Sequence, residues 1–80
     1  MAPDYVICHR SKYAEFTAKL SQAVESFFGP DASASGDYCR MCTVTHAERA
    51  VKLMETAVAK DGAKVICGGA SSSDAKSRYV

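Results

Sequence analysis

The residues from Ser11 to Pro30 constrain the fold more than any other part of the chain, because they carry the pattern of one amphipathic helix. Ser11 offers a hydroxyl that can cap the start of the helix. Gly29 can adopt the left-handed conformation that ends a helix, and Pro30 prevents its continuation. Between these ends, apolar side chains recur at three- and four-residue steps and form one stripe: Tyr13, Phe16, Leu20, Ala23, Val24 and Phe27. This stripe predicts a helix that packs one face on a core.

A second helix is predicted to begin at Thr43 or Thr45 and to end at Asp61-Gly62. Thr45 and Glu48 have the spacing of a capping box, and Thr43 is the alternative cap. The apolar side chains of this helix again fall on one face: Ala47, Ala50, Val51, Met54, Ala57 and Val58. Phe28 falls outside the stripe of the first helix, and we hypothesise that it contacts a surface that this chain lacks.

Three short segments have the composition of β-strands. Tyr5 to Cys8 is an apolar run, Ala63 to Cys67 is a second one closed by Gly68-Gly69, and Ser77 to Val80 reads as the start of a third. Strands separated by helical crossovers predict an α/β fold with parallel pairing. The expected architecture is a fragment of a doubly wound, mostly parallel sheet, in the order strand, helix, helix, strand and the start of a strand. So few elements would leave a sheet edge uncovered, which favours a piece of a larger domain over a self-sufficient one.

Size and charge exclude several classes of partner. The chain has 80 residues and a formal net charge of +1, so no charged field favours nucleic acid. No apolar run is long enough to span a bilayer, and the first residues lack the pattern of a signal peptide. We therefore expect a cytoplasmic, reducing location, in which the four cysteines are thiols.

The cysteines are the residues best suited to metal binding or redox chemistry. Cys39 and Cys42 have Cys-x-x-Cys spacing and His46 follows, but zinc needs four converging ligands and the chain has no second such pair. A redox dithiol would open a helix after a strand, which this pair does not do. His9 is expected to be a solvated loop residue, and no catalytic triad can be proposed from spacing.

Several motifs together carry a resemblance to a known family. Ala2-Pro3-Asp4-Tyr5 is similar to the Ala-Pro-Asp-Tyr run that follows the catalytic cysteine of class 3-type aldehyde dehydrogenases. Ser35 to Met41 resembles the family's Ser-x-Asp-Tyr-Gly-Arg-Ile segment, with Cys39 in place of the glycine. His46 to Arg49 is similar to its His-Phe-x-Arg, and Arg78-Tyr79-Val80 to its Arg-Tyr-Ile. Because these matches are collinear across the chain, they make a more specific signal together than each does alone.

The resemblance implies that residues 1–80 are part of the catalytic domain of an enzyme that oxidises aldehydes to carboxylic acids with NAD or NADP. In that family a cysteine thiolate attacks the aldehyde, hydride passes to the nicotinamide, and a glutamate-activated water releases the acid. The family's nucleophile, general base and cofactor glycines map before Met1, which falls one position past the nucleophile. The resemblance therefore implies no catalytic, cofactor-binding or metal-binding residue here, no cofactor bound by this chain alone, and a scaffold that is inactive in isolation.

Two other functions stay open from the residues themselves. One is a small non-enzymatic α/β module that binds zinc or a protein partner through Cys39, Cys42 and an exposed sheet edge. The other is a thiol-redox domain that uses the same two cysteines. The expected partner under the family resemblance is the remainder of the enzyme fold, and self-association through exposed apolar surface is the alternative.

Overall fold

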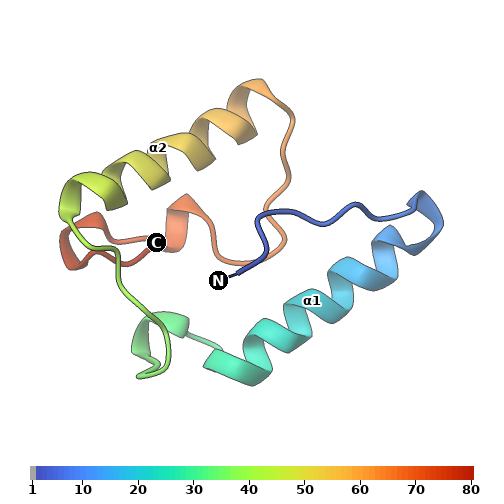
Figure 1. The fold of residues 1–80 in the computed structure, drawn as a ribbon, viewed down its shortest axis with the longest axis horizontal. Helices are drawn as coiled ribbons and strands as arrows, with labels where there is room; N and C mark the ends of the chain where they lie inside the picture. Colours follow the sequence, from blue (N-terminus) through green and yellow to red (C-terminus); the bar gives the residue numbers. More distant parts are fainter. Residues whose placement is uncertain (1) are drawn as a thin grey trace.

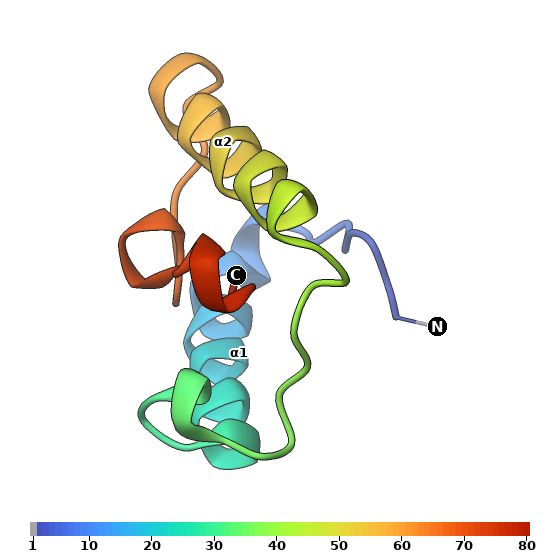
Figure 2. The same ribbon diagram turned by 90° about the vertical axis from the view of Figure 1, so that its left-hand side faces the viewer.

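Two helices dominate the fold of this chain. The computed structural model describes residues 2–80, in which α1 spans Tyr13–Phe28 and α2 spans Val44–Lys60 (Figure 1). Single 3-10 turns lie in the connections, at Arg10–Lys12, Ala32–Ala34, Ala70–Ser72 and Ala75–Ser77. The C-terminal segment lies between α1 and α2 in both views (Figure 2). Within the described residues, neither helix is long and apolar enough to cross a membrane.

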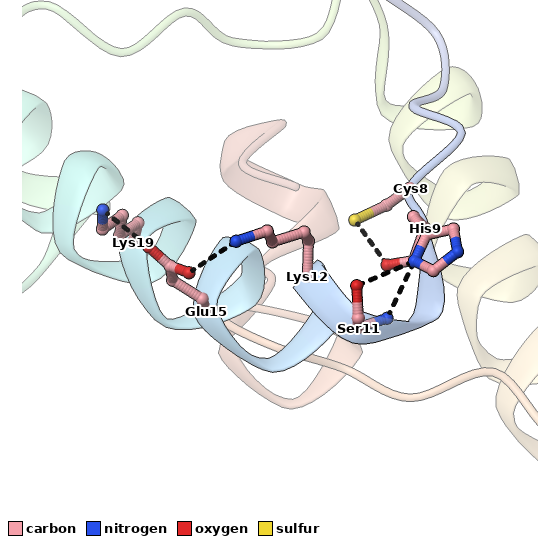
Figure 3. Close-up of polar contacts among 6 residues, drawn as sticks. All are labelled: Cys8, His9, Ser11, Lys12, Glu15 and Lys19. Atoms are coloured by element: carbon pink, nitrogen blue, oxygen red, sulfur yellow. Dashed lines mark hydrogen bonds and ion pairs between the residues drawn. The ribbon is translucent and has the colours of Figure 1, made fainter.

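The start of α1 differs from the predicted cap, whereas its end agrees with the prediction. Nδ1 of His9 accepts a hydrogen bond from the backbone N–H of Ser11 at 3.2 Å, so His9 caps the 3-10 turn that leads into the helix (Figure 3). Ser11 is the capped residue, and its hydroxyl lies 2.8 Å from the same ring nitrogen. Gly29 ends the helix with a φ of 80°, and its N–H donates to the carbonyl of Glu25.

The bounds of α2 settle the choice between its two possible caps. Oγ1 of Thr43 accepts a hydrogen bond from the N–H of His46 at 3.1 Å, so Thr43 is the cap and Thr45 lies inside the first turn. Asp61 closes the helix and Gly62 follows with a φ of 70°, as predicted. Most of the predicted stripe also faces inward: Ala47 is fully buried and Ala50, Val51, Met54 and Ala57 are half-buried, whereas Val58 is 48% exposed.

The predicted α/β fold is wrong, because residues 2–80 contain no β-strand. Residues 5–8 and 63–67 lie in irregular structure, and no backbone hydrogen bond joins these two segments in the described part of the chain. Residues 77–80 include the end of a 3-10 turn and no strand. The nearest approach to a sheet is one antiparallel bridge between Asp74 and Tyr79. An apolar, β-branched run forms a strand only when a second extended segment accepts and donates its ladder hydrogen bonds. Here Ile7 remains 90% exposed, so this apolar segment has no strand partner packed against it within the described residues.

The apolar stripe predicted for α1 faces the rest of the chain only in part, through the half-buried Ala23 and Val24. Tyr13, Phe16, Leu20 and Phe27 are 36–72% exposed. The half-buried positions of α1 are Thr17, Ser21, Ala23, Val24 and Phe28, so the face that contacts the chain is shifted from the predicted stripe toward Ser21 and Phe28. The hydroxyl of Ser21 donates to the carbonyl of Ile66 at 3.4 Å and so connects this face to the segment after α2. The expectation that Phe16 and Phe27 are core residues is therefore wrong.

Candidate functional site

Hydrogen bonds between distant parts of the sequence gather where the segment from Tyr38 to Cys42 meets Arg78–Val80. The N–H of Met41 donates to the carbonyl of Arg78 at 2.9 Å, and the Tyr38 hydroxyl donates to the carbonyl of Val80 at 2.9 Å. Nη1 of Arg78 donates to the carbonyl of Cys42 at 3.3 Å. Two of the segments that carry the family resemblance are thus brought together by hydrogen bonds, although they are far apart in the sequence.

Aromatic rings fill the space behind these hydrogen bonds. The ring of Phe28 meets that of Tyr38 edge to face with 5.1 Å between centroids, and Tyr38 meets Tyr79 at 5.5 Å. The guanidinium of Arg40 lies 5.0 Å from the centroid of the Tyr79 ring and donates to the carbonyl of Ser33 at 2.6 Å. Such a cation–π contact is worth about 0.5–1 kcal/mol where solvent reaches it. We call Phe28, Tyr38, Arg40 and Tyr79 the aromatic cluster.

The position of Phe28 bears on the hypothesis that it contacts a surface outside this chain. Its side chain is half-buried against Tyr38 and therefore has a partner within the chain. Because this packing covers the side chain only in part, the hypothesis that Phe28 also contacts a surface outside this chain stays a prediction.

Arg78 holds this arrangement through an unusual backbone conformation. It has a φ of 62° and is the one non-glycine residue with a positive φ in the described part of the chain. For a side chain with a Cβ, this conformation costs on the order of 1 kcal/mol. The turn it makes follows the Ala75–Ser77 helix and directs Tyr79, which is 9% exposed, into the aromatic cluster.

Two hollows border the aromatic cluster. The smaller, about 270 Å³, is lined by Phe28, Tyr38, Cys39, Arg40, Met41 and Val80, together with Asp37. The larger, about 750 Å³, lies between the end of α1, Met54 of α2 and the Gly68-Gly69 turn. Asp31 borders the larger hollow, and its carboxylate accepts hydrogen bonds from Ser33. Both hollows are open and largely apolar, and neither brings a nucleophile to a base among the residues described.

The cysteines do not converge. Cys39, Cys42 and Cys67 are exposed, Cys8 is half-buried, and all four are free thiols. The thiol of Cys8 donates to the carbonyl of His9 at 3.5 Å, which is a local contact. Across residues 2–80, no group of three or more histidine, cysteine or carboxylate side chains gathers as a metal site would require. No observation therefore favours a zinc module built on Cys39 and Cys42, and the sheet edge that it invoked is absent from the described residues.

Both histidines have structural positions. His9 is exposed, as expected, and caps the turn before α1. His46 is exposed in the first turn of α2, where its backbone N–H donates to the cap. Sequence reasoning missed the roles of Arg40 and Arg78, which bind carbonyls from other parts of the chain. Their signal was an arginine within two residues of a tyrosine in two of the matching motifs, at Tyr38 and Arg40 and at Arg78 and Tyr79.

Comparison with known proteins identifies the relatives of this chain. It is 39% identical over 80 residues to "aldehyde dehydrogenase, dimeric NADP-preferring" of Canis lupus familiaris and 36% identical to the protein of the same name from Bos taurus. It is 32% identical over 80 residues to "aldehyde dehydrogenase family 3 member A2" of Rattus norvegicus. Each match covers 100% of this chain. No protein-family model matches the chain, and no solved structure matches it significantly.

These matches define the class of protein that the chain resembles. The resemblance to class 3-type aldehyde dehydrogenases, predicted from the motifs, is confirmed along the whole chain. The chain spans 16%, 30% and 15% of the length of the canine, bovine and rat relatives. The similarity is therefore to one segment of oxidoreductases whose own chains are several times longer.

Proposed function

We propose that this chain is a scaffold segment of an NAD(P)-dependent aldehyde dehydrogenase, an enzyme that oxidises aldehydes to carboxylic acids. One observation carries the proposal. The segments that match the family are also the segments that pack together, since Tyr38 and Arg40 contact Tyr79 and Val80. A match confined to exposed loops would say little about a shared fold, whereas these residues contact one another across the chain.

The scaffold role rests on where the thiols lie. Nucleophilic catalysis needs a cysteine with a base in hydrogen-bonding reach and donors placed to hold an oxyanion. In the described residues, the hydrogen bond made by Cys8 goes to a backbone carbonyl, and the other thiols are exposed. The chain's contribution would then be to hold neighbouring parts of the enzyme in position, through the arginine and tyrosine contacts of the aromatic cluster.

A chimeric enzyme tests this function. The segment of the canine relative that matches residues 1–80 is replaced by this chain, and aldehyde-dependent NADPH formation is compared with that of the unmodified canine enzyme. We expect activity within about tenfold of the parent, because a segment that folds alike preserves the geometry on which catalysis depends. A folded chimera without activity would contradict the proposed function.

The chain by itself is expected to form no NADH or NADPH from aldehyde. Steady turnover that disappears in the Cys8→Ser variant, but persists in Cys67→Ser, would contradict the scaffold role. The Cys67→Ser variant is the matched control, since it removes a thiol of the same kind from an exposed site.

We also propose a cytoplasmic location, supported by four cysteines that are all free thiols. A fluorescent fusion of the chain should distribute through the cytosol. Accumulation in a membrane-bound compartment would contradict this part of the proposal.

A further inference from the structure

Helix α1 has two different faces, and one of them makes most of its contacts with the rest of residues 2–80. Each residue turns the helix by about 100°, so positions three, four and seven apart share a face. Ser21, Val24 and Phe28 share the inner face, which is half-buried. We call the exposed row on the adjoining face, namely Tyr13, Phe16, Leu20 and Phe27, the outer stripe.

The outer stripe has the anatomy of a buried interface. It contains three aromatic side chains and a leucine and no charged group, which is the composition of an interface core. A polar rim runs beside it. Lys12, Glu15 and Lys19 lie on the next face of the helix, where Nζ of Lys19 is 3.0 Å from Oε1 of Glu15 (Figure 3). These charged groups stay in solvent, so they mark where the apolar surface ends.

The surface area supports a large uncovered face. A monomer of this mass, 8.5 kDa, exposes on the order of 4,700 Å². This chain exposes 6657 Å², which leaves an excess of roughly 2,000 Å² by the same relation. An excess of this size is more than the roughly 800 Å² that one partner buries in a standard stable interface.

We propose that the outer stripe of α1 packs against the remaining polypeptide of an aldehyde dehydrogenase, which covers it with an apolar surface. This inference rests on the proposed function and adds to it the place of contact. The occupant follows from the comparisons, since the canine relative matches this whole chain with only 16% of its length. The rest of such a chain can supply an apolar surface to cover the stripe. The formal net charge of +1 on this chain would not repel it.

The outer face of α2 provides the matched control. Leu53 is an exposed leucine in the middle of α2, at 60%, and Leu20 is an exposed leucine in the middle of α1, at 42%. Leu53 stands at the margin of a stripe that already faces inward, whereas Leu20 stands at the centre of the outer stripe. The same substitution at the two sites therefore separates a covered surface from a free one.

The first test places Leu20→Glu and Leu53→Glu in the chimera with the canine enzyme. Burying a carboxylate against apolar surface is strongly unfavourable, so we expect L20E to lower the yield of soluble active enzyme by about tenfold or more. L53E should leave it within about twofold. An active chimera in which the two variants behave alike would overturn the inference and leave the proposed function intact.

The second test does not need catalysis. Leu20→Cys and Leu53→Cys are introduced separately into the chimera, and modification of each new thiol by a maleimide is followed by peptide mass spectrometry. We expect the thiol of L20C to react at least about tenfold more slowly than the thiol of L53C, because covered side chains react only when the structure opens. Equal rates would overturn the inference whether or not the chimera is active.

A second copy of this chain is the competing occupant, and the same residue pair identifies it. In that case the 80-residue chain on its own forms a discrete dimer, which L20E dissociates and L53E does not. If the two thiols of the chimera also react at equal rates, the outer stripe packs against a second copy and the proposal is wrong. Light scattering across a range of protein concentrations measures the mass.

Discussion

The two helices of this chain have similar length and similar amphipathic patterns, yet they treat their apolar stripes in opposite ways. In α2 most of the stripe faces inward, and Ala47 at its start is fully buried, whereas Val58 at its end is 48% exposed. In α1 most of the stripe faces outward, and the helix contacts the chain through Val24 together with Ser21 and Phe28, which lie outside the stripe. The difference teaches that an apolar stripe predicts the existence of a helix, whereas the neighbours available to it decide which face is covered.

The largest effect is expected from a substitution on the inward face of α2. Ala47→Glu should unfold the chain, because it introduces a charge where the side chain has no solvent contact, at a cost of several kcal/mol, roughly 3 or more. Ala59→Glu is the control, since Ala59 is exposed on the same helix. Helical circular dichroism should be lost in the first variant and kept in the second. Retained helicity in Ala47→Glu would show that α2 does not pack as described.

The next largest effect on stability comes from comparing a tyrosine of the aromatic cluster with a tyrosine of the outer stripe. Tyr79→Ala removes a ring at the centre of the aromatic cluster and should destabilise the chain by about 3 kcal/mol, as large-to-small changes in packed sites do. Tyr13→Ala removes a ring from the outer stripe and should change stability by less than about 1 kcal/mol, because alanine also favours the helix. Urea unfolding measures both. Equal losses would mean that the outer stripe is covered within this chain.

The two candidate caps of α2 give a smaller effect. Thr43→Ala removes the hydroxyl that accepts from His46 and should cost about 1 kcal/mol. Thr45→Ala is the matched control and should be near neutral, since Thr45 lies inside the first turn. The difference in urea midpoint between the two variants is the measured quantity, and a larger loss in Thr45→Ala would contradict the cap.

The smallest effect comes from the polar rim of α1. Lys19→Ala breaks the exposed ion pair with Glu15, which is worth about 0.3 kcal/mol and less at high salt. Lys12→Ala is the control, because Nζ of Lys12 is 4.0 Å from Glu15 at the limit of an ion pair. The gap between the two variants should close in concentrated salt. A gap that widens with salt would contradict an electrostatic cause.

The helices were predictable from the sequence because their signals are local. Gly29 and Asp61-Gly62 end them as expected, and Thr43 was one of the two caps that the pattern allowed. The strands were not predictable in the same way. Tyr5 to Cys8 has a strand's composition, but a strand also needs a hydrogen-bonding neighbour, and no local pattern reports whether one is present.

The candidate site was predictable in its sequence matches and not in its geometry. Ser35 to Met41 and Arg78 to Val80 were singled out by resemblance, and the structure brings them into contact. The contacts of Arg40 with Ser33 and of Arg78 with Cys42 depend on the turn at Arg78, which has a positive φ. Arginine rarely adopts that conformation, so its identity gave no indication of a turn there.

Amide hydrogen exchange, followed by peptide in the 80-residue chain alone and in the chimera with the canine enzyme, tests the role of α1 most directly. We predict that peptides from Tyr13–Phe28 gain strong protection in the chimera, and that peptides from Val44–Lys60 gain much less. Equal gains in the two helices, or no gain in α1, would contradict the conclusion that α1 presents an uncovered face to the rest of an aldehyde dehydrogenase.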